Sequence, residues 1–135
     1  MRAFLFIPLQ LFAGLVYGLF AVSSANPTQG LAADVINIQL PSGAVWELTV
    51  GHLFILFGIF CLFFELLKTV NPTDSEIAEV SISALVSISF LLCFVLWRPF
   101  GTSEFFLITM MSLLDFVVAG FVLVAVSRRT IDRER

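Results

Sequence analysis

The chain has 135 residues, of which 59% are hydrophobic and only 13% are charged. Its mean hydropathy of +1.04 excludes a soluble domain of this size, because such a domain needs a polar surface to face water. Ten acidic and seven basic residues, a net charge of −3, are spread over the termini and short loops. They leave no charged face for nucleic acid, and we expect a protein whose solvent is the lipid bilayer.

Four apolar stretches are each close to the roughly 20 residues that cross about 30 Å of hydrocarbon. We predict that each is a membrane-spanning helix. The predicted fold is an all-α membrane protein, a single domain over residues 1–135 built as an antiparallel four-helix bundle. The four predicted spans are residues 3–22, 50–67, 77–97 and 105–126.

The breaks between the later spans have the chemistry of helix ends. Pro72 interrupts the second helix, and Thr73 with Glu76 has the spacing of a capping box for the third. Thr102 or Ser103 is placed to cap the fourth. The third and fourth helices are therefore predicted to form an antiparallel hairpin.

The first apolar stretch has a second interpretation as a signal peptide. Arg2 precedes it, and the small residues Ser23, Ser24 and Ala25 follow it, as at a cleavage site. At about 20 residues the stretch is longer than the 7 to 15 residues typical of a signal-peptide core. We expect it to be retained as the first helix, with cleavage as the alternative.

Lysine and arginine accumulate on the cytoplasmic side of membrane proteins and so indicate orientation. With the N terminus inside, Arg98 is the one basic residue left outside, and both termini are cytoplasmic. Trp46 and Trp97 then lie at the outer interface, where amphipathic rings anchor a protein. The six basic residues placed inside are Arg2, Lys68, Arg128, Arg129, Arg133 and Arg135.

The predicted external segment, residues 25–49, has no Lys or Arg. Apolar and polar residues partly alternate over residues 35–40, residues 41–43 are the turn formers Pro, Ser and Gly, and residues 45–50 are again rich in β-formers. This pattern predicts a short β-hairpin lying on the outer ends of the helices. An isolated hairpin is only marginally stable, so it should pack on the bundle or on a partner. Irregular structure across the interface is the alternative.

Three segments of the chain, IQLPSGAVWELTVGHLFILFG, FFELLK and GTSEFFLITMMSLLDFVVAGF, are similar to a group of small four-helix bacterial inner-membrane proteins with no assigned activity. The resemblance covers more than half the chain. It implies a location in the bacterial inner membrane and carries no activity with it. In that group the position of His52 is often acidic, which implies that His52 is not a ligand.

Asp115 lies at the middle of the fourth apolar stretch. A charged side chain there costs roughly 2.5 to 3.5 kcal/mol on insertion scales, so it must be paired, neutralised or used. Thr109 and Ser112 share its helix face, which we expect to face protein. On the helical rise Asp115 is about 18 Å, Tyr17 about 21 Å and Ser87 about 15 Å from the inner ends of their helices. The predicted intramembrane polar site is Asp115, Tyr17, Ser87 and Ser112, with the acid neutral because no cation is at that level.

Glu65 is predicted to differ from Asp115, because it lies within one turn of the inner boundary. It can pair with Lys68 at i+3 and reach toward water. We therefore expect Glu65 and Lys68 to form an interfacial ion pair.

Other candidate chemistry is weak. His52 is the only histidine, and a metal site needs more ligands than the chain offers. Cys61 and Cys93 differ in predicted depth by more than about 10 Å, which excludes a disulfide between them. The chain has no phosphate loop, nucleophile elbow, paired catalytic acids or zinc motif, so we expect neither enzyme activity, metal nor cofactor.

Two function classes remain for a chain of this kind. The first, which we favour, is a non-catalytic accessory or structural subunit of a membrane complex. The second is a small transporter or channel component with Asp115 as a proton or cation site. The expected partners are the lipid bilayer and a membrane protein or a second copy of the chain. The basic tail, residues 127–135, is expected to continue the last helix and to anchor topology; docking to an acidic partner is the alternative.

Overall fold

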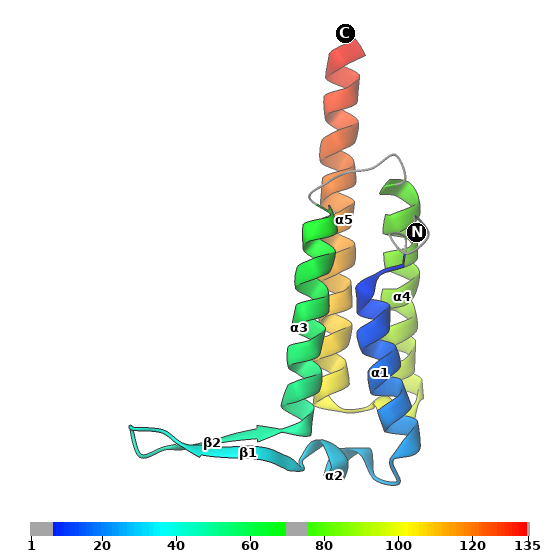
Figure 1. Cartoon of the computed structure of the whole chain (residues 1–135). Helices are drawn as coiled ribbons and strands as arrows, with labels where there is room; N and C mark the ends of the chain where they lie inside the picture. The colour runs from blue at the N-terminus through cyan, green and yellow to red at the C-terminus, as the bar shows by residue number, and fades with distance from the viewer. Residues whose placement is uncertain (1–6, 70–75, 135) are drawn as a thin grey trace.

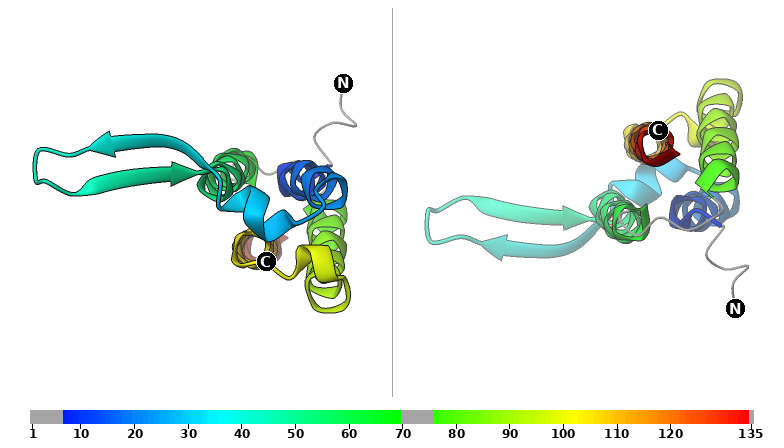
Figure 2. Two further views of the ribbon diagram at one scale, coloured as in Figure 1. Left: turned by 90° about the horizontal axis from the view of Figure 1, so that it is seen from below. Right: turned by 90° about the horizontal axis from the view of Figure 1, so that it is seen from above.

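The computed structural model describes residues 7–69 and 76–134, without the side chains of residues 76, 130 and 132–134. Four helices run side by side, and a two-stranded hairpin projects sideways from one end of them (Figure 1). A short helix, α2, crosses the same end (Figure 2). The elements are α1 (Leu9–Ser23), α2 (Pro27–Leu31), β1 (Asp34–Gln39), β2 (Val45–Thr49), α3 (Val50–Thr69), α4 (Glu76–Leu96), the 3-10 turn η2 (Arg98–Phe100) and α5 (Ser103–Glu134).

Three of the described helices are long and apolar enough to cross a membrane: residues Val50–Thr69, Ile77–Leu96 and Ser103–Arg129. The fourth, α1, has only 15 residues, about 22 Å of helix. It begins after Pro8, and residues 3–6 of the predicted span lie outside the described part of the chain. Of the four predicted spans, the first is thus the one that differs in length from expectation.

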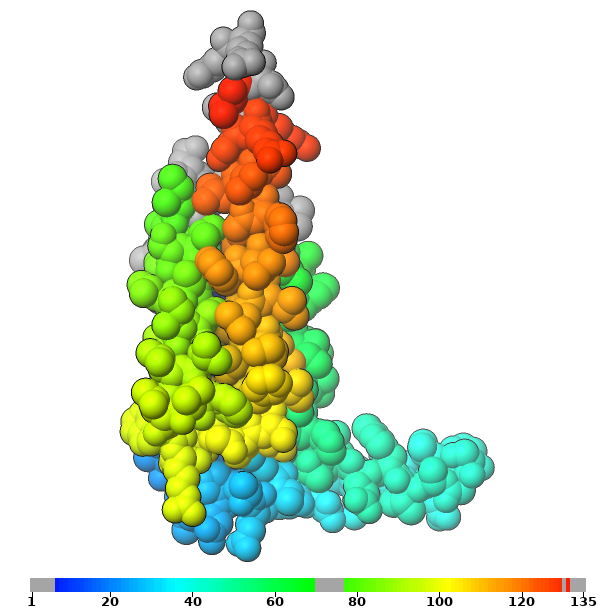
Figure 3. Space-filling model, turned by 180° about the vertical axis from the view of Figure 1, so that it is seen from behind, coloured from blue at the N-terminus to red at the C-terminus, as the bar shows by residue number. Residues whose placement is uncertain are grey.

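α5 is the central helix of the bundle, since it packs against each of α1, α3 and α4. It is a single helix of 32 residues that continues past the ends of its neighbours, as the view from behind shows (Figure 3). This confirms that the tail extends the last helix. The antiparallel pairing of α4 with α5 is also as predicted, and α1 packs against α3 as well as against α5.

The hairpin forms where the sequence places it. β1 pairs with β2 antiparallel, with Ile38 opposite Trp46. Gly43 supplies the turn with a φ of 85°, a conformation that favours glycine. At the base, the Val50 N–H donates to the Ala33 carbonyl at 3.0 Å.

The hairpin does not lie on the bundle, which corrects that part of the prediction. It leaves the bundle sideways in both end views (Figure 2), and every residue of β1 is exposed. Its attachment is the short stretch where β2 continues directly into α3. The hairpin is therefore an arm without contacts to the helices along most of its length.

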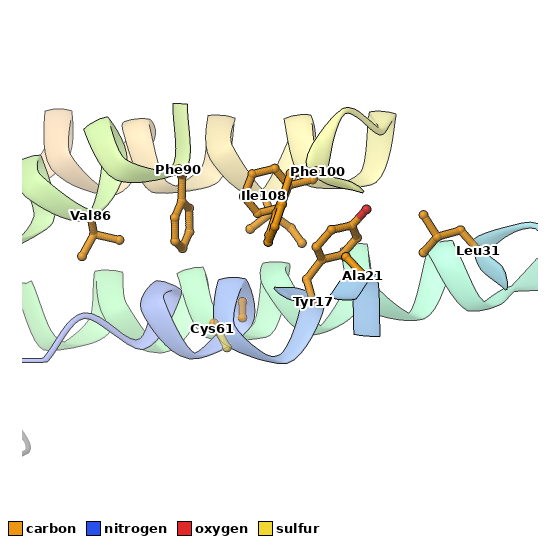
Figure 4. Packing of buried hydrophobic residues seen from close by; sticks show 10 residues of the cluster. Tyr17, Ala21, Leu31, Cys61, Val86, Phe90, Phe100 and Ile108 are labelled. Atoms are coloured by element: carbon orange, nitrogen blue, oxygen red, sulfur yellow. The ribbon is translucent and has the colours of Figure 1, made fainter. Parts of the chain in front are cut away.

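The core is an aromatic cluster between α1, α3, α4 and α5. The Tyr17 ring lies 5.4 Å from that of Phe54 and 5.1 Å from that of Phe105, centroid to centroid. The Phe90 side chain points from α4 toward α1 (Figure 4) and is 7% exposed. Since α1 contributes Tyr17 to this cluster with no exposed surface, the described part of the first apolar stretch is an integral part of the fold.

The turn between α4 and α5 is built as the sequence predicts. Thr102 caps α5: the Phe105 N–H donates to Thr102 Oγ1 at 3.3 Å. Glu104 lies in the first turn, where a carboxylate favours the positive end of the helix dipole. The predicted capping box of Thr73 with Glu76 is not described, since Thr73 and the side chain of Glu76 lie outside the described part of the chain.

Candidate functional site

The inward faces of the helices carry polar side chains that are almost completely buried. The predicted small and polar faces are confirmed: Ser112 and Asp115 of α5 are each 2% exposed, whereas Leu114 is 56% exposed. A polar interior inside an apolar exterior is the arrangement by which membrane bundles cohere. The buried polar side chains are Gln10, Glu65, Ser83, Ser87, Thr102, Thr109, Ser112 and Asp115.

Asp115 receives one hydrogen bond in this interior. The Ser83 hydroxyl of α4 donates to Asp115 Oδ2 at 3.2 Å. The other carboxyl oxygen, Oδ1, is buried and has no hydrogen-bond partner within the described residues. A buried acceptor without a partner is costly for an ionised carboxylate, so the site favours the protonated acid or a cation.

Ser87 and Ser112 meet as predicted, one turn from Asp115. Ser87 Oγ lies 2.9 Å from Ser112 Oγ and 2.9 Å from the Ser112 carbonyl oxygen. It also lies 2.8 Å from the Ser83 carbonyl oxygen of its own helix. Ser87 therefore joins α4 to α5. The predicted neighbour of Asp115 on α4 is Ser87, whereas the serine that contacts the acid is Ser83, one turn away on the same helix.

Glu65 forms the predicted pair with Lys68, whose Nζ donates to Glu65 Oε1 at 2.9 Å. Its position differs from the prediction, because Glu65 is only 5% exposed and does not extend toward water. Its second oxygen, Oε2, accepts from the Leu9 N–H at 2.8 Å. Leu9 is the first residue of α1, so Glu65 accepts from a free N–H at the positive end of that helix and joins α3 to it.

Asp115 and Glu65 lie close enough for their charges to interact. Asp115 is close enough to interact with the charges of Glu65, Lys68 and Glu79. Lys68, the cation among these groups, forms its ion pair with Glu65. Counted from the hairpin end, Glu65 and Asp115 are 15 and 12 residues into their helices, which gives them similar depths, about 22 and 18 Å.

Tyr17 is not a partner of Asp115. Its hydroxyl is hydrogen-bonded to Thr102 Oγ1 instead, at the start of α5 and 13 residues before Asp115. Depths counted from the predicted inner ends do not place the two side chains level, because α1 and α5 are aligned at the hairpin end. Measured from that end, Tyr17 is about 9 Å into α1 and Asp115 about 18 Å into α5.

Gln10 is a polar residue that the sequence argument missed. It has no exposed surface, and its Nε2 donates to the Ile108 carbonyl at 3.4 Å. Its Oε1 is the second buried side-chain acceptor without a partner within the described residues. Gln10 precedes Tyr17 by seven residues, which is two helical turns, so the two side chains share one face of α1. This spacing is the sequence feature that predicts the burial of Gln10. Thr102 was proposed as a cap and not as a core partner.

His52 is a helix cap. The Thr49 N–H donates to His52 Nδ1 at 3.1 Å, and the His52 N–H lies 3.4 Å from Thr49 Oγ1. This reciprocal arrangement at the start of α3 follows the logic of a capping box, with imidazole in place of a carboxylate. Its ring is exposed. The capping contact gives His52 a structural role at the start of α3.

The predicted interface anchors, Trp46 and Trp97, belong to the same end of the bundle, on β2 and directly before η2. They are 49% and 57% exposed. Cys61 and Cys93 are both free thiols, as expected from their depths.

The described residues contain no group of three or more His, Cys, Asp or Glu side chains that could hold a metal ion. The chemistry that the polar interior offers is hydrogen bonding between helices and the exchange of a proton at Asp115. No known protein family, curated protein or solved structure was found to match this chain.

Proposed function

We propose that this chain is a small integral membrane protein that crosses the membrane four times and acts as a non-catalytic accessory subunit, docking to a larger membrane complex through its β-hairpin. The resemblance noted in the sequence favours the bacterial inner membrane. The observation that carries the docking role is the hairpin arm itself, with its uncovered apolar face.

The membrane location is supported by the exterior of the bundle. Large apolar side chains stay exposed on every long helix, for example Leu19 at 74%, Phe60 at 55% and Val95 at 68%. Lipid tails satisfy such a surface, whereas water does not. α1 is a shorter apolar helix of 15 residues that packs against α3 and α5, and we propose that it makes the fourth crossing.

The strand register divides the hairpin into two unlike faces. Paired residues share a face of a sheet, so Ile36 lies with Leu48, and Ile38 with Trp46, on an apolar face. Asn37 and Glu47 pair on the opposite, more polar face, which also carries the pair of Gln39 with Val45. Ile38 and Trp46 are 44% and 49% exposed, which leaves the apolar face open.

A protein partner explains this open face better than an anionic lipid surface does. The hairpin carries two acidic residues, Asp34 and Glu47, and no Lys or Arg, so anionic headgroups repel it. Both strands are also edges, with unpaired backbone groups along their outer sides. A protein supplies hydrogen bonds to these edges as well as apolar contacts.

Photo-crosslinking from neighbouring hairpin positions tests the docking role. A photoreactive residue at position 38 faces the apolar side, and one at position 37 faces the polar side, which makes the second a matched control. We expect position 38 to crosslink to one discrete membrane protein, and Ile38→Asp to abolish stoichiometric co-purification of that protein while Asn37→Asp does not. Crosslinks to lipid alone would contradict the docking role and leave the membrane location intact.

Topology is tested separately with reporter fusions after Ser42 and after Arg135. We expect the hairpin outside and the tail inside, in line with the distribution of basic residues. α1 begins, and α5 ends, at the end of the bundle opposite the hairpin (Figure 1), which is consistent with this arrangement. An external tail would contradict the four crossings.

A second function, proton or cation transfer at Asp115, is favoured by one observation, the buried and unpartnered Oδ1. Asp115→Asn separates the two functions, because the amide oxygen still accepts from Ser83. If Asp115 only joins helices, the Asn variant keeps both abundance and activity. A variant that folds normally and is inactive would support transfer and overturn the purely structural role.

A further inference from the structure

Two cavities adjoin on one side of the bundle, where α1 and α4 leave a seam between them. The first, of about 320 Å³, is lined by apolar groups that include Gly14, Phe90 and Cys93. The second, of about 710 Å³, lies at the hairpin end and includes Ser24 and Arg98. Val22 lines both, so an apolar groove along the helices continues into a polar pocket at their end.

The groove exists because α1 and α4 do not pack along their length. Each contacts α5, and the Phe90 ring fills the space over Gly14, where an added Cβ would lie 2.0 Å from the ring. Gly18 has no side chain to fill the next turn. Leu15 and Leu19 form the outer rim and are 55% and 74% exposed, which leaves the groove open toward the surroundings of the helices.

The polar pocket has a net positive charge. Arg98 is the only Lys or Arg between Lys68 and Arg128. Its side chain is exposed and forms no ion pair or hydrogen bond within the part of the chain that the structure describes. Asn26 and Thr28 add neutral polar groups, and no acidic residue is among the described residues that line the pocket. Guanidinium with neutral donors is the chemistry that binds a phosphate.

We propose that the two cavities form one binding site for a phospholipid with an anionic headgroup. The headgroup phosphate binds Arg98 in the polar pocket, and one acyl chain lies in the groove between α1 and α4. The polar part of the site lies at the end of the bundle, and its apolar part lies along the helices. A phospholipid in a leaflet has the same orientation, with its headgroup at the membrane surface and its acyl chains along the helices. This inference rests on the proposed membrane location.

Native mass spectrometry of the purified, delipidated full chain tests the site. The probes are phosphatidylglycerol and phosphatidylcholine with identical acyl chains. We expect one phosphatidylglycerol per chain, bound about fivefold more tightly than phosphatidylcholine, which corresponds to one cation beside an anionic headgroup. Arg98→Gln should remove this preference, and its exposed position leaves the fold intact. The matched control, Arg128→Gln, removes a cation at the opposite end and should keep the preference.

A groove-filling variant tests the acyl-chain part. Cys93→Phe adds a ring within the groove and should weaken the binding of both lipids, whereas Leu96→Phe adds bulk on the exposed surface of α4 and should not. Equal affinity for the two lipids in the wild type, or wild-type binding by both Arg98→Gln and Cys93→Phe, would overturn the site. Carbonate extraction of native membranes separates this failure from that of the membrane location, since a chain that resists extraction is still a membrane protein.

Discussion

The bundle and the hairpin both expose apolar side chains, yet they do so for different physical reasons. In the helices every backbone group between the ends is paired within its own helix, so an apolar exterior needs only lipid around it. In the hairpin each strand has one unpaired edge, so lipid alone leaves backbone groups without partners. Under the proposed function, similar exposure therefore corresponds to lipid contact for the bundle and to a protein partner for the arm.

The two regions also differ in how they are held. The bundle is joined by buried polar contacts between helices, including Glu65 with Leu9 and Ser83 with Asp115. The hairpin has only its own ladder and the contact at its base. Substitutions should therefore affect stability in the bundle and binding in the arm, and the following variants test this separation in order of their expected effect on stability.

The largest effect is expected for Glu65→Leu. It removes the acceptor of the Leu9 N–H and leaves Lys68 without its partner. We expect a loss of about 2 to 4 kcal/mol in the free energy of unfolding, because both groups lose hydrogen bonds inside the bundle. Unfolding in mixed micelles measures it. Glu65→Gln, which keeps an acceptor for Leu9, should lose less than half as much; equal losses would show that charge alone matters.

The local contact of the Phe90 ring with α1 at Gly14 is tested by Gly14→Ala. The added methyl group would lie 2.0 Å from the Phe90 ring, and displacing a buried ring typically costs about 1 to 3 kcal/mol. The control is Gly120→Ala on α5, where nothing lies within 4 Å of the added carbon. The same unfolding assay should show no loss for the control. Similar values for the two variants would contradict the packing of Phe90 over Gly14.

A double-mutant cycle sharpens the corrected position of Tyr17. Tyr17→Phe combined with Thr102→Val should give a coupling energy of about 0.5 to 1.5 kcal/mol, the net contribution of one hydrogen bond. The same cycle with Asp115→Asn should give a coupling near zero, because the two side chains belong to different levels of the bundle. If Tyr17 were coupled to Asp115 and not to Thr102, its partner would be Asp115, as predicted from the sequence.

The smallest effect on stability is expected for Ile38→Asp in the arm. Ile38 is 44% exposed, and surface substitutions usually change stability by less than about 0.5 kcal/mol. The same variant should nevertheless lose the docking partner, because it places a charge on the apolar face. Unfolding and co-purification are measured on the same preparation. A loss of stability comparable to that of Glu65→Leu would show that the hairpin is part of the bundle after all.

Much of the local structure followed from residue patterns. The turn at Gly43 and the strands on either side of it are predicted by alternation and turn chemistry, which act over a few residues. The buried face of α5 is predicted by helical periodicity, since Ser112 and Asp115 lie on one side and Leu114 on the other. The pair of Glu65 with Lys68 is likewise a contact within one helix turn.

Contacts between helices followed much less well. Tyr17 was assigned to Asp115 by depth, yet its hydroxyl bonds Thr102, which precedes Asp115 by 13 residues, more than three turns. Ser83 and Ser87 share a face of α4, and one turn separates the serine that bonds the acid from the one that bonds Ser112. Depth along one helix does not fix its axial offset from another, because that offset depends on how the side chains of both interdigitate.

The sequence by itself determined the apolar class of the chain, the helices and strands, and the faces that each buries, because these depend on composition and on short-range periodicity. The tertiary structure decided that Glu65 joins α3 to the start of α1, that the hairpin leaves the bundle sideways, and that α1 and α4 stay apart to form a groove beside Arg98. These features depend on the mutual offset and tilt of whole helices, which arise from the packing of many side chains at once and have no signal in any single stretch of sequence.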